Sequence, residues 1–405
     1  MLQSFSCSKV ELLERLGRTP RSCNVRLLRR RRLAPEHSTS RALVLARNAR
    51  SMVNVLISRH IERAPAFMPI LLMFITYRCN LQCRMCGVCE RAAPGPPQKE
   101  ITLEECKAVL DSAERLRTTL MLVSGGEALV RPEVVFEMIR YGAERGIATH
   151  LCTNGILLTE ETVQQLRASG VKTVSVSLDS DEKAIHDSLR GPGVYEAAVA
   201  GISHLRTLAP EVQVGINYTL SSVNFRNMDR FVRFAESLGV HQLKFAPIHT
   251  NLLHKNKDIE HFGDLLFRAE QLPDLEREVK RLIDALRRSR LTTSSPDFLS
   301  QIPALYRGAP RFRCYAGYAA CTINPYGIAT PCTDMDGTLS VRERSLDEIW
   351  RSEEYHALRR QVAHCKCSCW DALYSELSLK LRPLALLKNG LRIWRELGFY
   401  FGKPM

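Results

Sequence analysis

The sequence predicts an α/β protein: a partial (β/α)6 TIM-like barrel followed by a small cysteine-rich α+β domain. Between residues 69 and 247, apolar runs alternate with amphipathic helical stretches, which is typical of a parallel sheet built from β–α units. There are six such runs, three-quarters of the number in a closed eight-stranded barrel. A separate group of cysteines lies between residues 314 and 369, beyond the predicted barrel.

The strands are expected where apolar and β-branched residues run together, at residues 70–77, 119–123, 148–152, 173–178, 212–220 and 242–245. The intervening helices are expected near residues 103–117, 131–146, 160–169, 194–208 and 225–238. The first helix should begin after Thr102, because Glu104 and Glu105 then favour the positive end of its dipole. In such a barrel, the loops at the carboxyl ends of the strands form the active face.

Residues 1–64 form a basic N-terminal extension, with 13 Arg and one Lys against four Glu, a net charge of +10 out of the chain's +14. The run at residues 29–32 suits a phosphate-rich partner or an anionic membrane surface. A disordered, solvated arm, or a true start at Met52 or Met68, is the favoured interpretation. Residues 42–63 are expected to form a basic helix under the barrel. The rest of the chain is nearly balanced, so no nucleic-acid partner is expected.

The composition is that of an ordinary globular protein, with 405 residues, 45% hydrophobic and 25% charged. Fourteen cysteines gathered in two groups favour metal ligation in a reducing cytoplasm over a secreted disulfide framework. No apolar run reaches the roughly 18 residues of a membrane span, and no signal peptide is evident. A cytoplasmic location is therefore expected.

Three cysteines follow the first predicted strand at the spacing C-x3-C-x2-C: Cys79, Cys83 and Cys86. Iron in iron–sulfur clusters is bound by cysteine thiolates, and three ligands for a four-iron cluster leave one iron without a protein ligand. An open coordination position is typical of a catalytic metal. A structural zinc site that also uses Cys89 is the alternative.

This loop and its position resemble the radical SAM superfamily. In that family the loop binds a [4Fe-4S] cluster whose free iron chelates the methionyl amino and carboxylate groups of S-adenosylmethionine (SAM). The resemblance implies that Cys79, Cys83 and Cys86 are the catalytic cluster ligands. Met85 stands where the family usually has an aromatic residue against the adenine, and methionine offers a softer apolar surface for that role.

Further fragments at the ends of later strands resemble family motifs in the same order. Residues 124–128 look like the G-G-E-P loop that holds the methionyl amino group, with Ala128 in place of proline, and residues 153–155 resemble the T-N-G turn. Residues 186–191 resemble H-D-x-x-R-G, whose arginine meets the SAM carboxylate; a capping role for His186 and Asp187 stays open. The implied cofactor-binding residues are Met85, Gly125, Gly126, Glu127, Asn154, Ser177, Asp179, Arg190 and Asn217.

Beyond the barrel, residues 274–291 are expected to form a charged helix and residues 292–310 a linker. The second cysteine group follows. Its turn at residues 324–327 has Pro second and Gly fourth, which predicts a hairpin that brings Cys321 near Cys332. A capping box at residues 345–348 then starts a helix expected to end at residue 360, which returns the last cysteines toward the hairpin.

This region resembles the auxiliary-cluster domains called SPASM and twitch. The resemblance implies one auxiliary [4Fe-4S] cluster held by Cys314, Cys321, Cys332 and one of Cys365, Cys367 or Cys369. A second, incompletely ligated cluster and a zinc ribbon are the alternatives. The predicted domains are 1–64, the radical SAM core at 65–291, the linker, the auxiliary-cluster domain at 311–373, and a helical tail at 374–405 that packs along the barrel.

The resemblance implies reductive cleavage of SAM to a 5'-deoxyadenosyl radical, which abstracts hydrogen from a peptide or small-metabolite substrate. The auxiliary cluster would transfer an electron or bind the substrate. A flavodoxin or ferredoxin is the expected electron donor, and the absence of a winged-helix pattern in residues 1–64 favours a metabolite or a partner-delivered substrate. No general base is assigned among the candidates Cys152, Asp334 and Asp336. The alternative is a non-catalytic iron–sulfur or zinc protein that binds nucleic acid through its basic arm.

Overall fold

The computed structural model describes residues 41–88, 99–248, 262–308, 312–365 and 369–401. The chain divides into two compact units, Met1–Leu45 and Ala46–Met405. Of the first unit, the structure describes only the opening residues of helix α1 (Arg41–His60). The architecture given below is that of the second unit.

One nine-stranded sheet organises the second unit, in the order β7-β6-β5-β4-β3-β2-β1-β8-β9. Every neighbouring pair is parallel except the hairpin between β8 and β9. The first six strands follow the chain order, which confirms the predicted open partial barrel. The strands are β1 (Ile70–Phe74), β2 (Leu120–Ser124), β3 (Ala148–Thr153), β4 (Thr173–Ser177), β5 (Gln213–Leu220), β6 (Gln242–Pro247), β7 (Thr292–Thr293), β8 (Ala320–Ile323) and β9 (Ala329–Thr330).

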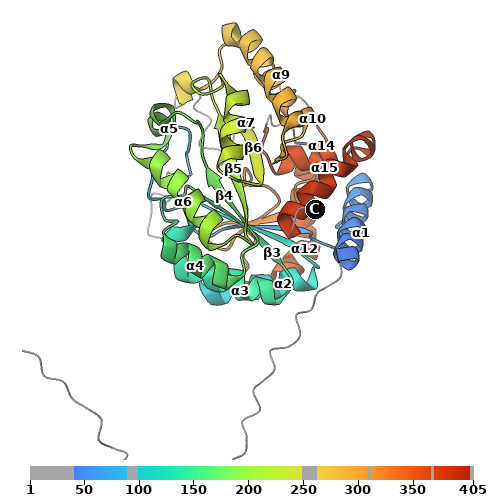
Figure 1. The fold of residues 1–405 in the computed structure, drawn as a ribbon. Helices are drawn as coiled ribbons and strands as arrows, with labels where there is room; N and C mark the ends of the chain where they lie inside the picture. The colour runs from blue at the N-terminus through green and yellow to red at the C-terminus, as the bar shows by residue number, and fades with distance from the viewer. Residues whose placement is uncertain (1–40, 89–98, 249–261, 309–311, 366–368, 402–405) are drawn as a thin grey trace, which may run out of the picture. The chain divides into compact units, whose positions relative to one another are not determined.

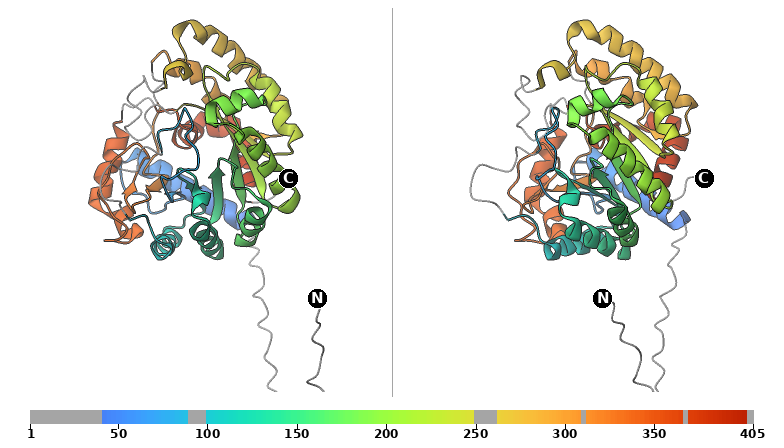
Figure 2. Two further views of the ribbon diagram at one scale, coloured as in Figure 1. Left: turned by 90° about the vertical axis from the view of Figure 1, so that its left-hand side faces the viewer. Right: turned by 60° about the vertical axis from the view of Figure 1, so that its left-hand side comes forward.

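The connecting helices lie along the outer side of the curved sheet, as Figures 1 and 2 show. They include α2 (Leu103–Arg115), α3 (Pro132–Glu144), α4 (Glu160–Ser169), α6 (Val194–Leu208) and α7 (Met228–Ser237). Helix α2 begins where the sequence predicts, because the Thr102 hydroxyl accepts from the Glu105 amide and the Glu105 carboxylate accepts from the Thr102 amide. Leu71, Met121 and Ile139 belong to the main core between these layers.

Residues 292–310 were expected to be a linker, but the described part of this segment is packed structure. It contains β7, α10 (Pro296–Leu299) and α11 (Ile302–Leu305), which follow α9 (Leu272–Arg288). The side chains of Phe298 and Ile302 are buried in the main core. The Ser295-Pro296 pair begins a helix, because the Ser295 hydroxyl accepts from the Phe298 amide and Pro296 occupies the first helical turn.

The cysteine-rich region continues the barrel sheet. β8 pairs with β1 so that Cys321 lies opposite Leu71, and the predicted hairpin turn to β9 forms with Gly327 at a φ of 79°. The single helix expected over residues 346–360 is two helices, α12 (Leu346–Arg351) and α13 (Glu353–Ala363). They separate at Ser352, whose backbone is extended and whose hydroxyl caps α13.

The C-terminal tail folds as α14 (Tyr374–Lys380) and α15 (Pro383–Phe401). The Phe399 ring of α15 lies 6.0 Å from the His150 ring of β3, and the Glu396 carboxylate accepts from Lys244 Nζ of β6 at 2.6 Å. The tail therefore packs against the barrel strands. Within the described residues, no helix combines the length and apolar character that a membrane crossing requires.

Candidate functional site

The first cysteine loop lies beyond the carboxyl end of β1 and carries three cysteines, none of which forms a disulfide. Cys79, Cys83 and Cys86 are each partly buried. Burial raises the pKa of Cys83 to about 11; Arg190 opposes this increase, and Cys86 and Cys79 add to it. The three sulfur atoms are therefore electrostatic neighbours. Cys89 lies outside the described residues.

Among the described residues, no group of three His, Cys, Asp or Glu side chains is arranged to hold a single metal ion. The three thiolates of a four-iron cluster bind separate irons, so this cluster does not require such convergence. Hydrogen-bond donors also face the loop sulfurs: the Leu81 amide lies 3.4 Å from Cys79 Sγ, and Arg190 Nη1 lies 3.9 Å from Cys83 Sγ. The donor set fits an iron–sulfur cluster with one open iron.

The two-glycine turn after β2 is tied to the chain that leads into the cysteine loop. The Gly126 amide donates to the Thr76 carbonyl at 2.8 Å. A Cβ atom at Gly125 would lie 2.4 Å from the Thr76 carbonyl oxygen, and one at Gly126 would lie 2.2 Å from that of Arg78. Both positions therefore require glycine, and the turn lies directly against the segment before Cys79.

The carboxylate of Glu127 joins the loops after β2 and β3. It accepts from the Leu129 amide at 3.0 Å, from the Thr153 hydroxyl at 3.0 Å and from the Asn154 amide at 2.8 Å. The side chain is 1% exposed. Burial raises its pKa, and these hydrogen bonds oppose the rise. Glu127 was predicted to bind the cofactor. In the structure its carboxylate instead makes hydrogen bonds that position the loops after β2 and β3.

The loop held by Glu127 reaches the first cysteine. Asn154 Nδ2 donates to Asn80 Oδ1 at 2.7 Å and lies 3.9 Å from Cys79 Sγ. The Asn154 side chain is itself mostly buried. The turns after β2 and β3 therefore meet at the cysteine loop.

Replacing Glu127 with glutamine is expected to destabilise the fold by about 1–3 kcal/mol, because an amide NH2 would face backbone and hydroxyl donors and leave one of them unpaired. Denaturant unfolding should show this loss, and calorimetry should show weaker SAM binding. Glu133→Gln, on the exposed start of α3, is the matched control and should change neither quantity. Equal stability of the two variants would contradict the positioning role.

A buried ion pair lies beside the second cysteine. Arg190 Nε donates to Asp179 Oδ2 at 2.5 Å, and Asp179 Oδ1 also accepts from the Thr219 amide at 2.7 Å. Asp179 is fully buried. Burial works against the charge of Arg190, but Asp179 raises the pKa of the guanidinium above its usual value. The charged arginine is therefore held next to Cys83.

His186 and Asp187 have structural contacts, in line with the alternative that the sequence left open. His186 Nδ1 accepts from the Asp179 amide at 3.0 Å, and burial lowers the histidine pKa to about 4. Asp187 accepts from the Gly193 and Tyr195 amides. These two side chains fix the end of α5 (Lys183–Arg190), the helix that carries Arg190.

The other predicted cofactor contacts line the same end of the barrel. Ser177 of β4 lies opposite Asn217 of β5 in the sheet register. Asn217 Nδ2 approaches Cys152 Sγ at 3.7 Å, and burial raises the pKa of Cys152 to about 11, which does not favour a general base. Met85 is buried in a small apolar cluster with Leu189. Contact of these residues with SAM stays a prediction.

In the second cysteine group, Cys314 and Cys332 come together. Both pack against one apolar cluster that contains Ala316 and Tyr374. The Ala316 amide lies 3.4 Å from Cys314 Sγ, and the Asp334 amide lies 3.4 Å from Cys332 Sγ. Burial raises the pKa of Cys332 well above its usual value, and Asp334 and Cys314 add to the rise.

The distal cysteines reach the same area by way of the chain before α14. Asp371, two residues beyond the buried Cys369, also raises the pKa of Cys332. Cys365 is exposed, and Cys367 lies outside the described residues. Of the described distal cysteines, Cys369 is therefore the one nearest in sequence to Asp371, the carboxylate that acts electrostatically on Cys332.

Comparisons with known proteins decide the family. The model of the radical SAM superfamily matches residues 73–235, and that of the SPASM iron–sulfur cluster-binding domain matches residues 314–370. This chain is a radical SAM enzyme with a SPASM domain. Its cofactors are SAM and a [4Fe-4S] cluster in the barrel, with auxiliary iron–sulfur binding in the SPASM domain.

Relatives cover most of the chain. The AdoMet-dependent heme synthase of Methanosarcina barkeri is 28% identical over 334 residues, 78% of this chain and 91% of the relative. Mycofactocin maturase MftC of Mycolicibacterium smegmatis is 28% identical over 302 residues, 73% of this chain and 74% of the relative. The PqqA peptide cyclase of Rhodopseudomonas palustris is 25% identical over 317 residues, 76% of this chain and 79% of the relative.

Solved structures share the fold. Streptococcus suis SuiB, crystallised with the precursor peptide SuiA, superposes with a TM-score of 0.57 at 17% identity, covering 80% of this chain and 73% of SuiB. The structure of anSMEcpe with bound AdoMet gives a TM-score of 0.56 at 15% identity, covering 81% of this chain and 99% of that one. These similarities support the partial barrel and its cysteine-rich extension.

The SPASM domain does not bring Cys321 to Cys314 and Cys332. Successive side chains of a strand point to opposite faces. On β8, Thr322 bonds the Tyr374 hydroxyl at 2.7 Å on the side of Cys314, whereas Cys321 belongs to the main core with Tyr355. The hairpin brings the two backbones together as predicted, but the side-chain alternation turns the Cys321 thiol away.

Two buried arginines, which the sequence gave no reason to select, hold the Cys314 loop. Arg59 Nε of α1 donates to the Cys314 carbonyl at 2.9 Å, and Arg359 Nε of α13 donates to the Gly317 carbonyl at 2.7 Å. They are 3% and 0% exposed. Gly317 has a φ of 72°, and a Cβ atom there would lie 2.7 Å from Pro331. The loop is therefore fixed against the residue before Cys332.

Proposed function

We propose that this radical SAM enzyme removes a hydrogen atom from a substrate bound over the carboxyl ends of the barrel strands. The observation that carries the proposal is the approach of Asn154 and Arg190, from two different strand–helix loops, to the sulfurs of Cys79 and Cys83. Bound together, SAM and the cluster supply one-electron chemistry that can remove hydrogen from an unactivated carbon. The residues of this chain would bind the cluster and position SAM.

The proposed roles follow from position. Cys79, Cys83 and Cys86 would bind the cluster and leave one iron open. Arg190, kept charged by Asp179, offers a planar fork of N–H donors that suits the methionine carboxylate. The backbone of Gly125 and Gly126 would approach the methionyl amino group, Met85 would pack against the adenine, and the strand ends at Asn154, Ser177 and Asn217 would face the rest of SAM.

We infer that the auxiliary cluster is bound by Cys314 and Cys332, with Cys369 as the favoured distal ligand. Cys314 and Cys332 pack against one apolar cluster, and Asp371, two residues after Cys369, acts electrostatically on Cys332, whereas Cys321 belongs to the main core. Cys365 and Cys367 remain candidates for a further position. An electron donor of the flavodoxin or ferredoxin type would reduce the protein.

A peptide is the favoured substrate class, because MftC and the PqqA peptide cyclase are relatives and the similarly folded SuiB was crystallised with a precursor peptide. The AdoMet-dependent heme synthases favour a small metabolite as the second candidate, because that relative from Methanosarcina barkeri is covered over 91% of its length. The comparisons do not favour a non-catalytic protein that binds nucleic acid.

The test is an anaerobic reconstitution of the full chain. With one auxiliary cluster, it should bind about eight irons and release 5'-deoxyadenosine when SAM and a strong reductant are added. Incubation with candidate peptides or tetrapyrroles in deuterated form should transfer deuterium into 5'-deoxyadenosine only for the correct class. A protein that binds iron but never cleaves SAM would refute the proposal.

Replacing Arg359 with glutamine is expected to lower the iron content toward that of the barrel cluster alone. The shorter neutral amide loses charge-assisted hydrogen bonds to the Gly317 and Trp350 carbonyls, each worth about 1.5–3 kcal/mol. Iron analysis and thermal unfolding should measure the two effects. Arg360→Gln, the neighbouring exposed arginine that pairs with Glu353, should leave both unchanged. Full iron content in Arg359→Gln would show that the Cys314 loop does not depend on this arginine.

A further inference from the structure

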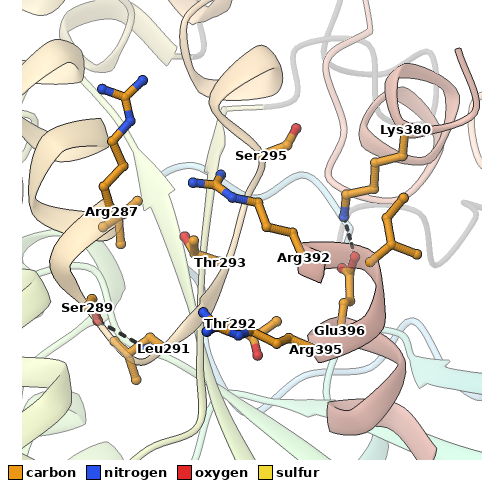
Figure 3. A pocket seen from close by; sticks show the side chains of 12 residues that line it. Arg287, Ser289, Leu291, Thr292, Thr293, Ser295, Lys380, Arg392, Arg395 and Glu396 are labelled. Atoms are coloured by element: carbon orange, nitrogen blue, oxygen red, sulfur yellow. Dashed lines mark hydrogen bonds and ion pairs between the residues drawn. The ribbon is translucent and has the colours of Figure 1, made fainter. Parts of the chain in front are cut away.

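A pocket lies away from the cysteine loop, between the end of α9, the segment at residues 289–295, and α15 (Figure 3). Thr292 of β7 pairs with Gln242, the first residue of β6. The pocket is therefore at the amino end of the strands, whereas the cysteine loop follows their carboxyl ends. The pocket is therefore separate from the site proposed for the radical SAM chemistry.

The pocket is strongly basic. Its lining includes Arg287, Lys380, Arg392 and Arg395, and among the described lining residues the one acidic side chain is Glu396. Glu396 is already neutralised, because its carboxylate bonds both Lys244 and Lys380. The positive charge that faces the pocket therefore comes mainly from the three arginines, which Figure 3 shows extending from α9 and α15 around residues 292–295.

Two of these arginines have no carboxylate within ion-pair distance in the described part of the chain: Arg392 and Arg395. Arg287 has only the exposed Asp284 of its own helix, at 3.1 Å. Burial, and then the charges of Arg287 and Arg395, lower the pKa of Arg392. Asp297 opposes this decrease, but it lies beyond ion-pair distance of Arg392. The positive charges gathered here are therefore only partly compensated, which costs folding free energy unless an anion is bound.

A hydroxyl group completes the lining. Thr293 lines the pocket, and its Oγ1 is buried with no hydrogen-bond partner among the described residues. The two serine hydroxyls of the lining already have hydrogen-bond partners, since the Ser289 hydroxyl donates to Glu236 at 2.6 Å and the Ser295 hydroxyl caps α10. A buried hydroxyl without a partner carries a desolvation cost that a bound oxygen atom would remove.

We propose that this pocket binds the oxyanion group of a small ligand, a phosphate or a carboxylate. Guanidinium forks match both groups with paired N–H donors, and the Thr293 hydroxyl supplies one more donor. The ligand stands apart from SAM, because the pocket lies at the opposite end of the strands. Glu396 connects the pocket to Lys244 inside the barrel, so an occupied pocket also touches the network that holds α15 to β6.

The test is calorimetric titration of the reconstituted full-length enzyme with inorganic phosphate and, separately, with citrate. Binding of either one supports the site, and the preferred anion identifies the source as a phosphate or a carboxylate ligand. The double variant Arg392→Gln/Arg395→Gln should weaken that binding at least tenfold. Arg288→Gln, an arginine on α9 outside the pocket lining, is the control and should bind like the wild type.

A milder variant guards against misfolding. Thr293→Val keeps the size of the side chain and all four basic residues, and it should weaken binding several-fold with an unchanged melting temperature. Absence of binding of both anions at millimolar concentration would overturn the proposal. Binding that the double variant retains, or that Arg288→Gln loses equally, would also overturn it.

Discussion

Replacing Cys83 with alanine is expected to abolish 5'-deoxyadenosine formation and to remove about four irons from the reconstituted protein. Cys83 is the central thiol of its loop, and the pKa of its sulfur responds to Arg190, Cys86 and Cys79 together. Two thiolates are too few to hold a four-iron cluster securely, and without it SAM has no iron to bind. Iron analysis, the visible absorption of the cluster and product chromatography measure the loss.

Cys106→Ala is the matched control. Cys106 is a free thiol in the core side of α2, so its removal changes the cysteine count without touching the loop. We expect full iron content and full SAM cleavage in this variant. SAM cleavage by Cys83→Ala at a rate close to that of the control would exclude the cysteine loop as the cluster site.

The sequence alone predicted the barrel well because its signals are local. The strands are apolar runs, the start of α2 is a capping box at Thr102, and the order of the motifs places each at the end of its own strand. Parallel strands bring those ends to one edge, so residues far apart in the chain were correctly expected near the first cysteine loop.

At the two cysteine sites, what the sequence could not predict has one physical cause, since it depends on where a side chain points. The hairpin turn predicts that Cys321 and Cys332 are near in backbone, but the alternation along β8 decides which face the thiol takes. The sequence motif around Glu127 does not show whether its carboxylate contacts a ligand or accepts hydrogen bonds from Thr153 and Asn154. Arg59 is more than 250 residues from the Cys314 carbonyl that it bonds, and no local pattern reports such a contact.

Replacing Arg190 with glutamine is expected to destabilise the fold by about 3–5 kcal/mol, because it leaves the Asp179 carboxylate buried without its counter-charge. SAM affinity should fall about 10- to 100-fold if the guanidinium also binds the methionine carboxylate. The chain offers a matched control in Arg230, which pairs with Asp181 at 2.6 Å but is 43% exposed. Arg230→Gln should cost less than about 1 kcal/mol, since exposed ion pairs contribute little.

The double variant Asp179→Asn/Arg190→Gln separates the two roles of the arginine. An asparagine at 179 still offers an oxygen to the Thr219 amide and leaves no buried charge behind, so much of the lost stability should return. SAM affinity should stay low, because the Arg190 guanidinium beside the first cysteine loop is still missing. If the double variant regained SAM affinity together with stability, Arg190 would be a structural partner of Asp179 alone and not a ligand of the cofactor.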